Sequence, residues 1–263
     1  MIPSAFTYKR PATLDDALNE LTEAGENGKL LAGGHSLIPL MKLRFVQPET
    51  LIDIGTLKEL SYIRQDGDQI AIGALTRHVD VETSDLIRSN CNLLAETAAE
   101  VGDVQVRNRG TIGGSLAHGD GNADLPAAMI ALDAQLVARS ANGQRIIPAR
   151  EFFRDFLTTA LEPTEILTEI RVPILKNART AYVKFNRRSN DWAIVGCATI
   201  IANDSQTIAW TGVGATPVLA DHDDWHTTVS QLQPIADIAG SAEYKRHLAT
   251  TLAERALTKA RAI

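Results

Sequence analysis

The pattern of hydrophobic and polar positions changes repeatedly between helical and strand spacing, which predicts a fold that mixes helices and sheets. Residues 13–24 have their apolar positions at helical spacing, at Leu14, Ala17, Leu18 and Leu21. Short apolar runs at 29–31 and 51–54 predict strands, with a short helix expected at 37–43 between them. The first 55 residues therefore predict a small βαβ lobe with a parallel sheet.

The rest of the chain predicts two further segments. Hairpins are expected at 62–72 and 135–148, helices at 79–87, 92–101 and 125–132, and a strand at 165–172. Beyond residue 176, three runs at 181–186, 193–202 and 207–213 predict an antiparallel meander, and a long helix is expected over 242–261. We therefore expect lobes at 1–55, 56–176 and 177–263, the last with a three-stranded antiparallel sheet and helices.

Two similar glycine-rich stretches stand out, Ala32-Gly33-Gly34-His35-Ser36-Leu37 and Thr111-Ile112-Gly113-Gly114-Ser115. Paired glycines at a strand–helix junction allow positive φ and let a ligand approach bare backbone amides. Ser36 is expected to cap the following helix. Each stretch alone could be a tight turn, but two cups of N–H donors about eighty residues apart favour a diphosphate held between two parts of one fold.

Composition and charge narrow the function classes. The chain is 44% apolar and 22% charged, as in ordinary globular proteins, and its net charge of −6 gives no footprint for nucleic acid. Two cysteines, Cys91 and Cys197, are too few for an iron–sulfur site within this chain, and we expect free thiols. The first residues lack a signal-peptide pattern and the longest apolar run, 193–202, is too short to span a bilayer, so a cytoplasmic location is expected.

The sequence around both glycine pairs resembles a known family. Residues 32–54 read AGGHSLIPLMKLRFVQPETLIDI, and residues 111–136 read TIGGSLAHGDGNADLPAAMIALDAQL. Both are similar to the FAD-binding medium subunit of the molybdenum hydroxylases, and most similar to the carbon monoxide dehydrogenase type; the likeness extends to 1–11 and 240–249. It implies an α+β fold shared with vanillyl-alcohol oxidase flavoproteins, with two N-terminal α/β lobes and a C-terminal antiparallel sheet with helices.

The resemblance also implies roles for single residues. It implies that both glycine cups hold the FAD pyrophosphate, that His118 lies against the FAD, and that Asp124 lies near its ribityl or pyrophosphate. It further implies that Leu167 packs on the flavin, that Lys184 reaches toward it, and that Trp192 stands where the carbon monoxide dehydrogenase type carries tyrosine. From the residues alone, Asp124 is a helix cap, Leu167 a core residue, Lys184 part of a solvated strand face and Trp192 a packing residue.

The family likeness implies an electron-transfer subunit that holds FAD without a covalent bond. The partners it implies are a large subunit with a molybdenum cofactor and a small subunit with two-iron iron–sulfur clusters, as a dimer of heterotrimers. Two alternatives are a self-sufficient flavin oxidase or reductase and a binding module without cofactor. His35 beside Gly33-Gly34 also allows covalent flavin, as in related oxidases. No metal site is expected in this chain, because Asp120 and Asp124 lack a third ligand.

Overall fold

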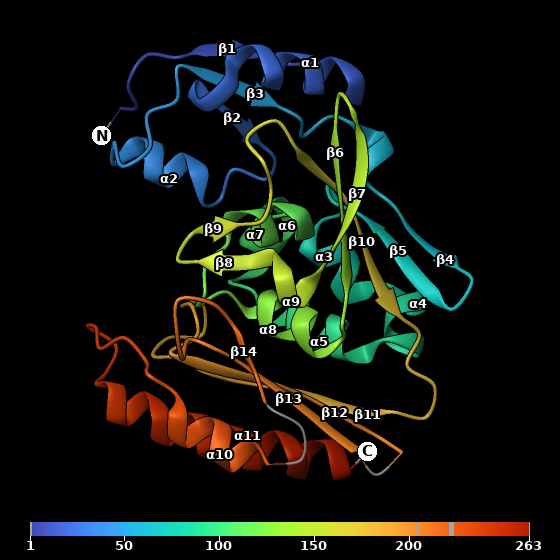
Figure 1. The fold of residues 1–263 in the computed structure, drawn as a ribbon, viewed down its shortest axis with the longest axis vertical. Helices are drawn as coiled ribbons and strands as arrows, with labels where there is room; N and C mark the ends of the chain where they lie inside the picture. The colour runs from blue at the N-terminus through green and yellow to red at the C-terminus, as the bar shows by residue number, and fades with distance from the viewer. Residues whose placement is uncertain (1, 204, 221–223, 263) are drawn as a thin grey trace.

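The three larger sheets follow one another along the long axis of the molecule, with most helices packed between them (Figure 1). The computed structural model describes residues 2–203, 205–220 and 224–262. The first sheet lies at one end, and the last sheet lies at the other end under the C-terminal helix. Within the described residues, no helix combines the length and the apolar character that crossing a membrane requires.

The first lobe is the expected parallel unit. Its sheet has the order β1-β3-β2, and both pairings are parallel. Its elements are β1 (Thr7–Lys9), α1 (Leu14–Ala24), β2 (Gly28–Leu31), α2 (Leu37–Lys42) and β3 (Thr50–Asp53). Thr13 caps α1, because its side chain accepts a hydrogen bond from the Asp16 amide at 3.1 Å. The strand β1 was not predicted, since three residues are too short to show a period.

The middle of the chain forms a five-stranded antiparallel sheet in the order β4-β5-β10-β6-β7. Its strands are β4 (Ile63–Asp66), β5 (Gln69–Gly73), β6 (Gln135–Ser140), β7 (Gly143–Pro148) and β10 (Ile166–Pro173). Both predicted hairpins are confirmed. A separate small hairpin, which the pattern did not predict, joins β8 (Phe153–Asp155) to β9 (Thr158–Thr159).

Short helices pack beside this sheet. They are α3 (His78–Thr83), α4 (Asp85–Asn90), α5 (Asn92–Ala99), α6 (Val104–Arg109), α7 (Ile112–His118), α8 (Asp124–Ala131) and α9 (Ala149–Phe152). The segment predicted as helical at 79–87 is divided between α3 and α4, because Ser84 leaves the helical conformation and caps α4. Helix α6 was not predicted; it begins where the Asp103 carboxylate accepts from the Val106 amide at 2.8 Å.

The C-terminal sheet has four strands where three were predicted. They are β11 (Arg179–Phe185), β12 (Val195–Ala202), β13 (Ser205–Thr211) and β14 (Val218–Leu219), paired antiparallel in that order. The two-residue β14 pairs with β13 and was too short to predict. Helix α10 (Trp225–Gln231) precedes α11 (Ala242–Arg261), and α11 is confirmed at its predicted bounds. The Trp210 indole anchors α11 by donating to the Ala249 carbonyl at 3.0 Å.

The hydrophobic clusters do not coincide with the three predicted lobes. The first lobe has a cluster around Leu18 and Ile52, joined from the middle segment by Leu57, Leu60, Leu75 and Ile166. The middle segment and the C-terminal sheet share a larger cluster, in which Tyr182, Ala198, Ile200 and Ala209 pack with residues of α5 and α8. The division into lobes at 55 and 176 stays a prediction, and the second boundary runs through one continuous core.

The backbones of the first lobe and the middle segment approach each other closely at Gly33. A Cβ atom there would overlap the carbonyl oxygen of Arg109 and lie 2.8 Å from the Cα atom of Gly110. The Arg77 guanidinium donates to the same Arg109 carbonyl, which fixes that backbone in place. Glycine is therefore required at position 33 by the approach of two backbones.

We expect Gly33→Ala to destabilise the protein by about 1 to 3 kcal/mol, because the added methyl group must push two backbone segments apart. The midpoint of urea unfolding measures this. Gly214→Ala is the matched control, since a Cβ there lies 3.5 Å from its nearest neighbour, the Thr216 carbonyl oxygen. The control should change stability by less than about 0.5 kcal/mol. Equal midpoints for the two variants would contradict the close approach at Gly33.

Candidate functional site

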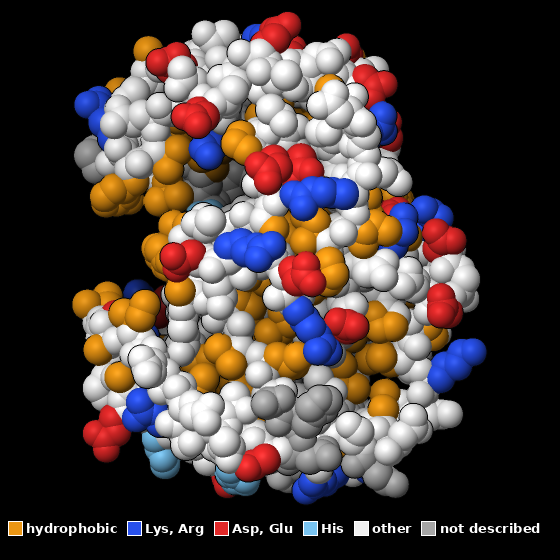
Figure 2. Space-filling model, in the orientation of Figure 1, with side chains coloured by type: hydrophobic (Ala, Val, Ile, Leu, Met, Phe, Trp, Pro, Cys, Tyr) orange, Lys and Arg blue, Asp and Glu red, His pale blue; other side chains and the backbone are white. Residues whose placement is uncertain are grey.

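A large cavity lies between the first lobe and the middle segment and reaches the C-terminal sheet. Its volume is about 750 Å³, within the range of about 300 to 1,000 Å³ typical of ligand sites. Figure 2 shows the molecule hollowed between these parts, on the side where α2 and β8–β9 lie in Figure 1, with hydrophobic side chains along the rim. Every predicted site residue except Ile112 lines this cavity.

Ile112 belongs to the core instead. Its side chain is fully buried in the shared hydrophobic cluster, and its amide donates to the Thr76 carbonyl at 3.0 Å. An apolar residue between Thr111 and the glycines faces inward, because α7 begins there and turns that position toward the sheet. Its neighbours Thr111, Gly113 and Gly114 do line the cavity.

The first glycine stretch presents free backbone donors. Among the described residues, the amides of 33–37 donate no hydrogen bond, although the next amide, of Ile38, donates to Gly34. Gly34 has φ +77°, which a residue with a side chain adopts only with strain. The predicted cap is wrong: Ser36 is already helical and its hydroxyl caps nothing. The amides and the hydroxyl together form a cup of available donors, an arrangement that suits an anion.

The second stretch differs from the first. Its amides from 112 to 115 are engaged: Ile112 and Gly113 donate to carbonyls of Thr76 and Ala74, and Gly114 and Ser115 donate to Thr111. The expectation of a second cup of free N–H donors is therefore wrong. Thr111 is the residue that caps here, with its hydroxyl 3.1 Å from the Gly114 amide. What this stretch offers the cavity is the hydroxyl of Ser115, which has no partner among the described residues, and a smooth glycine surface.

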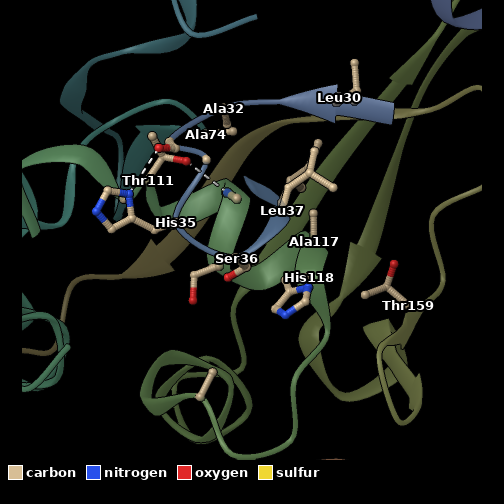
Figure 3. Close-up of a pocket in the computed structure, with 18 of the residues that line it drawn as sticks. Leu30, Ala32, His35, Ser36, Leu37, Ala74, Thr111, Ala117, His118 and Thr159 are labelled. Atoms are coloured by element: carbon tan, nitrogen blue, oxygen red, sulfur yellow. Dashed lines mark hydrogen bonds between the residues drawn. The ribbon is translucent and has the colours of Figure 1, made fainter. Parts of the chain in front are cut away.

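Both stretches meet in one space. Figure 3 shows Ser36 and Leu37 of the first stretch together with Ala117 and His118 of α7, and Thr159 lies across from them. The glycines make this packing possible. A Cβ atom at Gly113 would overlap that of Ala74, and one at Gly114 would lie 2.7 Å from the Thr111 hydroxyl.

Basic residues surround the first cup. His78 lines the cavity and is only 3% exposed, and its Nδ1 atom has no partner among the described residues. The pKa of His78 is lowered to about 4, mainly by burial and then by the charges of Arg107, His35 and Arg77 in that order of effect. His78 is therefore neutral at pH 7, and Arg77, which donates to the Arg109 carbonyl beside Gly33, supplies positive potential near the cup. His35 is exposed, with Nδ1 3.2 Å from the Gly33 carbonyl oxygen.

A buried ion pair closes another part of the cavity. The Lys184 Nζ lies 3.2 Å from Asp124 Oδ2 and 2.8 Å from the Glu100 carbonyl oxygen, and the lysine side chain is 1% exposed. The Tyr182 hydroxyl donates to Asp124 Oδ1 at 2.8 Å. Burial raises the pKa of Asp124 to about 6, opposed by Lys184 and Tyr182. This arrangement contradicts two readings of the residues alone, because Lys184 is not solvated and Asp124 caps nothing: the cap position is Ala123.

The remaining predicted residues also lie at the cavity. Leu167 is buried in β10, immediately before a bulge in its pairing with β6. His118 ends α7, and partial burial lowers its pKa, opposed by Asp120. Trp192 is 49% exposed, so it lies at the opening rather than in the core. Bulges and exposed aromatic residues are common beside binding sites.

Several lining residues were missed. They come from segments distant in sequence: Lys29, Ala74, His78, Val101, Gly102, Val106 and Thr159. Lys29 lies in β2, three residues before the first glycine stretch, so its position was a usable signal; the others reach the cavity only through tertiary packing. Within the described part of the chain, no three His, Cys, Asp or Glu side chains gather as metal ligands. Both cysteines are free and buried.

We expect His78 to weaken the fold in acid. Its folded pKa of about 4 lies below the value of about 6.5 in the unfolded chain, so the unfolded state takes up the proton first as pH falls. Between pH 7 and 4.5 the parent should lose about 2 to 3 kcal/mol of stability relative to His78→Gln. Denaturant unfolding at several pH values measures this difference.

Two points assign the difference in stability between the parent and His78→Gln to His78 itself. The raised pKa of Asp124 acts in the opposite direction, adding stability as pH falls through about 6, but it is present in both proteins and cancels. His247→Gln, at an exposed position on α11, should follow the parent at every pH. If His78→Gln and the parent lose stability in parallel, the buried neutral imidazole is ruled out.

Comparison with known proteins agrees with this architecture. Residues 4–175 match the family described as the FAD binding domain in molybdopterin dehydrogenase. The chain is 39% identical to the carbon monoxide dehydrogenase medium chain of Hydrogenophaga pseudoflava, covering 99% of this chain and 98% of that one. It is 38% identical to the 6-hydroxypseudooxynicotine dehydrogenase complex subunit alpha of Paenarthrobacter nicotinovorans, covering 99% and 96%.

Solved structures show the same likeness. A carbon monoxide dehydrogenase from Hydrogenophaga pseudoflava superposes with a TM-score of 0.95 at 40% identity, covering all of this chain and 99% of that one. Quinoline 2-oxidoreductase from Pseudomonas putida 86 superposes with a TM-score of 0.92 at 29% identity, with the same coverage. The full-length matches and the matched domain together show that this chain belongs to the family of FAD-binding domains of molybdopterin dehydrogenases.

Proposed function

We propose that this chain is the FAD-binding medium subunit of a molybdenum hydroxylase complex and relays electrons from a partner's iron–sulfur clusters to an outside acceptor. The observation that carries the proposal is the cavity itself. Free amides line it at the first glycine stretch, and a buried lysine lines it at Lys184. An elongated ligand with a diphosphate and a ring that accepts negative charge fits both features.

The residues present fit FAD. The amides of 33–37 and the hydroxyls of Ser36 and Ser115 would hold the pyrophosphate, with Thr111, Gly113 and Gly114 supplying a close glycine wall. Arg77 adds positive potential near that part of an otherwise acidic protein, whereas Arg107 is paired with Glu82 at 2.7 Å. Asp124, His118, Leu167, Lys184 and Trp192 would surround the ribityl chain and the flavin ring, as the family likeness implies.

When bound, FAD supplies the capacity to take up and release electrons. The chain's own residues bind and orient it and shape its surroundings. Lys184 places a positive charge at the cavity wall, and Leu167 and Val101 exclude water from their side of it. Within the described residues, no three His, Cys, Asp or Glu side chains gather to hold a catalytic metal ion, which is compatible with a relay role.

The opening of the cavity suits a protein partner. Ile38, Leu43 and Phe45 lie in or just after α2, and Phe156 and Leu157 form the turn between β8 and β9; all are exposed, Phe45 by 77%. Leu157 also lines the cavity. Exposed apolar side chains beside a site mark an interface. We assign this rim, residues 38–45 and 156–157, to the small iron–sulfur subunit, with a large molybdenum subunit completing each half of a dimer of heterotrimers in the cytoplasm.

The purified chain should bind FAD at least about 100-fold more tightly than FMN, because FMN has one phosphate and leaves part of the cavity unfilled. Fluorescence titration of the apoprotein measures both affinities. Acid precipitation should release the flavin. A yellow pellet from the parent that becomes colourless in His35→Ala would establish the covalent oxidase alternative instead.

The isolated chain should not reduce its flavin with aldehydes, purines or carbon monoxide. Anaerobic bleaching of the flavin should need added molybdenum and iron–sulfur subunits. Phe45→Glu should slow bleaching in the reconstituted complex by at least about tenfold, because it places a charge in the apolar rim. Ile146→Glu, at an exposed position on β7, is the control and should leave the rate of flavin bleaching unchanged. Rapid bleaching by a substrate with the chain alone would favour a self-sufficient oxidoreductase.

A further inference from the structure

The backbone of Tyr182 is held from outside its sheet. Strand β11 is an edge strand, so one row of its backbone groups has no strand to pair with. At Tyr182 the amide donates to Glu96 Oε2 of α5 at 3.1 Å, and the carbonyl accepts from Lys259 Nζ of α11 at 3.2 Å. Glu96 and Lys259 also pair with each other at 3.2 Å. These two side chains take the place of a neighbouring strand and fix this part of β11.

The side chain of Tyr182 is committed to Asp124. The residue is 3% exposed, and its hydroxyl donates to Asp124 Oδ1 at 2.8 Å. Gly196 makes room for it, since a Cβ there would overlap the hydroxyl oxygen. Lys184 lies two residues further along the same face of β11 and holds Oδ2. Two neighbours on one strand face therefore hold both oxygens of one carboxylate.

Only part of this cluster reaches the ligand space. Asp124 and Lys184 line the large cavity, whereas Tyr182 lies behind them. We propose that Tyr182 is a positioning residue that keeps Asp124 ionised and paired with Lys184, so that the ligand meets a fixed ion pair at neutral pH. This inference rests on the proposed binding of FAD. Tyr182 acts through Asp124 and does not itself touch the ligand.

The charges around Asp124 set the direction of the effect. Lys184 and Tyr182 face it from β11, and the nearby charge of Glu100 at the end of α5 opposes them by raising the pKa of Asp124. Among the other described groups, Glu96 is occupied by Tyr182 and Lys259, and Arg150 of α9 pairs with Asp133. Strands β12 and β13 carry no charged side chain, and His118 of α7 lines the cavity. Removing the hydroxyl therefore leaves Asp124 easier to protonate.

The test uses Tyr182→Phe, which keeps the ring and removes only the hydroxyl. The visible absorption of bound FAD is titrated from pH 5 to 9 in the purified full chain. The parent should show a transition near pH 6 that Asp124→Asn abolishes. In Tyr182→Phe the midpoint should rise by about one pH unit, the effect of losing one hydrogen bond to a charged group. An unchanged midpoint, or a parent without a transition that Asp124→Asn removes, overturns the inference.

Tyr62→Phe is the matched control. The Tyr62 hydroxyl donates to Glu169 Oε2 at 2.6 Å, but neither residue lines the cavity, so the FAD transition should not move. If Tyr182→Phe does not fold, 3-fluorotyrosine at position 182 replaces it. Its more acidic hydroxyl is a stronger donor and should lower the midpoint; no change there also overturns the inference. A parent that binds no FAD contradicts the proposed function instead.

Discussion

The structure depends on how one buried positive charge is compensated. The Lys184 ammonium is almost fully removed from water, and an unpaired charge in such a place costs several kcal/mol. Its partners are the Asp124 carboxylate and the Glu100 carbonyl, which come from the start of α8 and the end of α5. Satisfying this lysine therefore requires the C-terminal sheet to lie against two helices of the middle segment.

The same requirement explains the shape of the shared core. Helix α8 packs against β12, β13 and β14 as well as α5, so its apolar side chains belong to both segments. Its first residue, Asp124, carries the charge that meets Lys184. Apolar packing supplies most of the stabilisation, and the ion pair fixes the position of one segment against the other. The cavity then forms where the first lobe meets this combined unit.

Local patterns in the sequence were enough to predict the longer elements. The helix at 242–261, the two large hairpins and the capped helix after Thr13 follow from period and turn residues. The failures have physical causes. Ser36 and Asp124 are residue types that favour caps, but Ser36 stands at the cap position of α2 without a capping hydrogen bond, and Asp124 lies one residue past the cap of α8. Ile112 sits within a glycine motif yet faces the core, because the motif says nothing about which side of the new helix is buried.

Local sequence patterns also predicted part of the candidate site, whereas the rest of it depends on tertiary contacts. The two glycine stretches identified where a ligand approaches, but not that Thr76, Ala74 and Thr111 occupy the amides of the second one. Lys184 could be placed in a strand, and only its family likeness, not its pattern, indicated that it points inward. His78 and Val101 reach the cavity from segments without any ligand motif, so no local signal could have found them.

The unequal division of the cores has a mechanical consequence. Separating the C-terminal sheet from the middle segment would expose the larger shared core, whereas the cluster of the first lobe includes four residues of its neighbour, Leu57, Leu60, Leu75 and Ile166. A hinge movement of the first lobe therefore exposes the smaller apolar cluster. Because the cavity lies between the first lobe and the rest of the molecule, a ligand that contacts both sides holds the two parts together. Entry and release of the ligand are therefore coupled to the hinge movement of the first lobe.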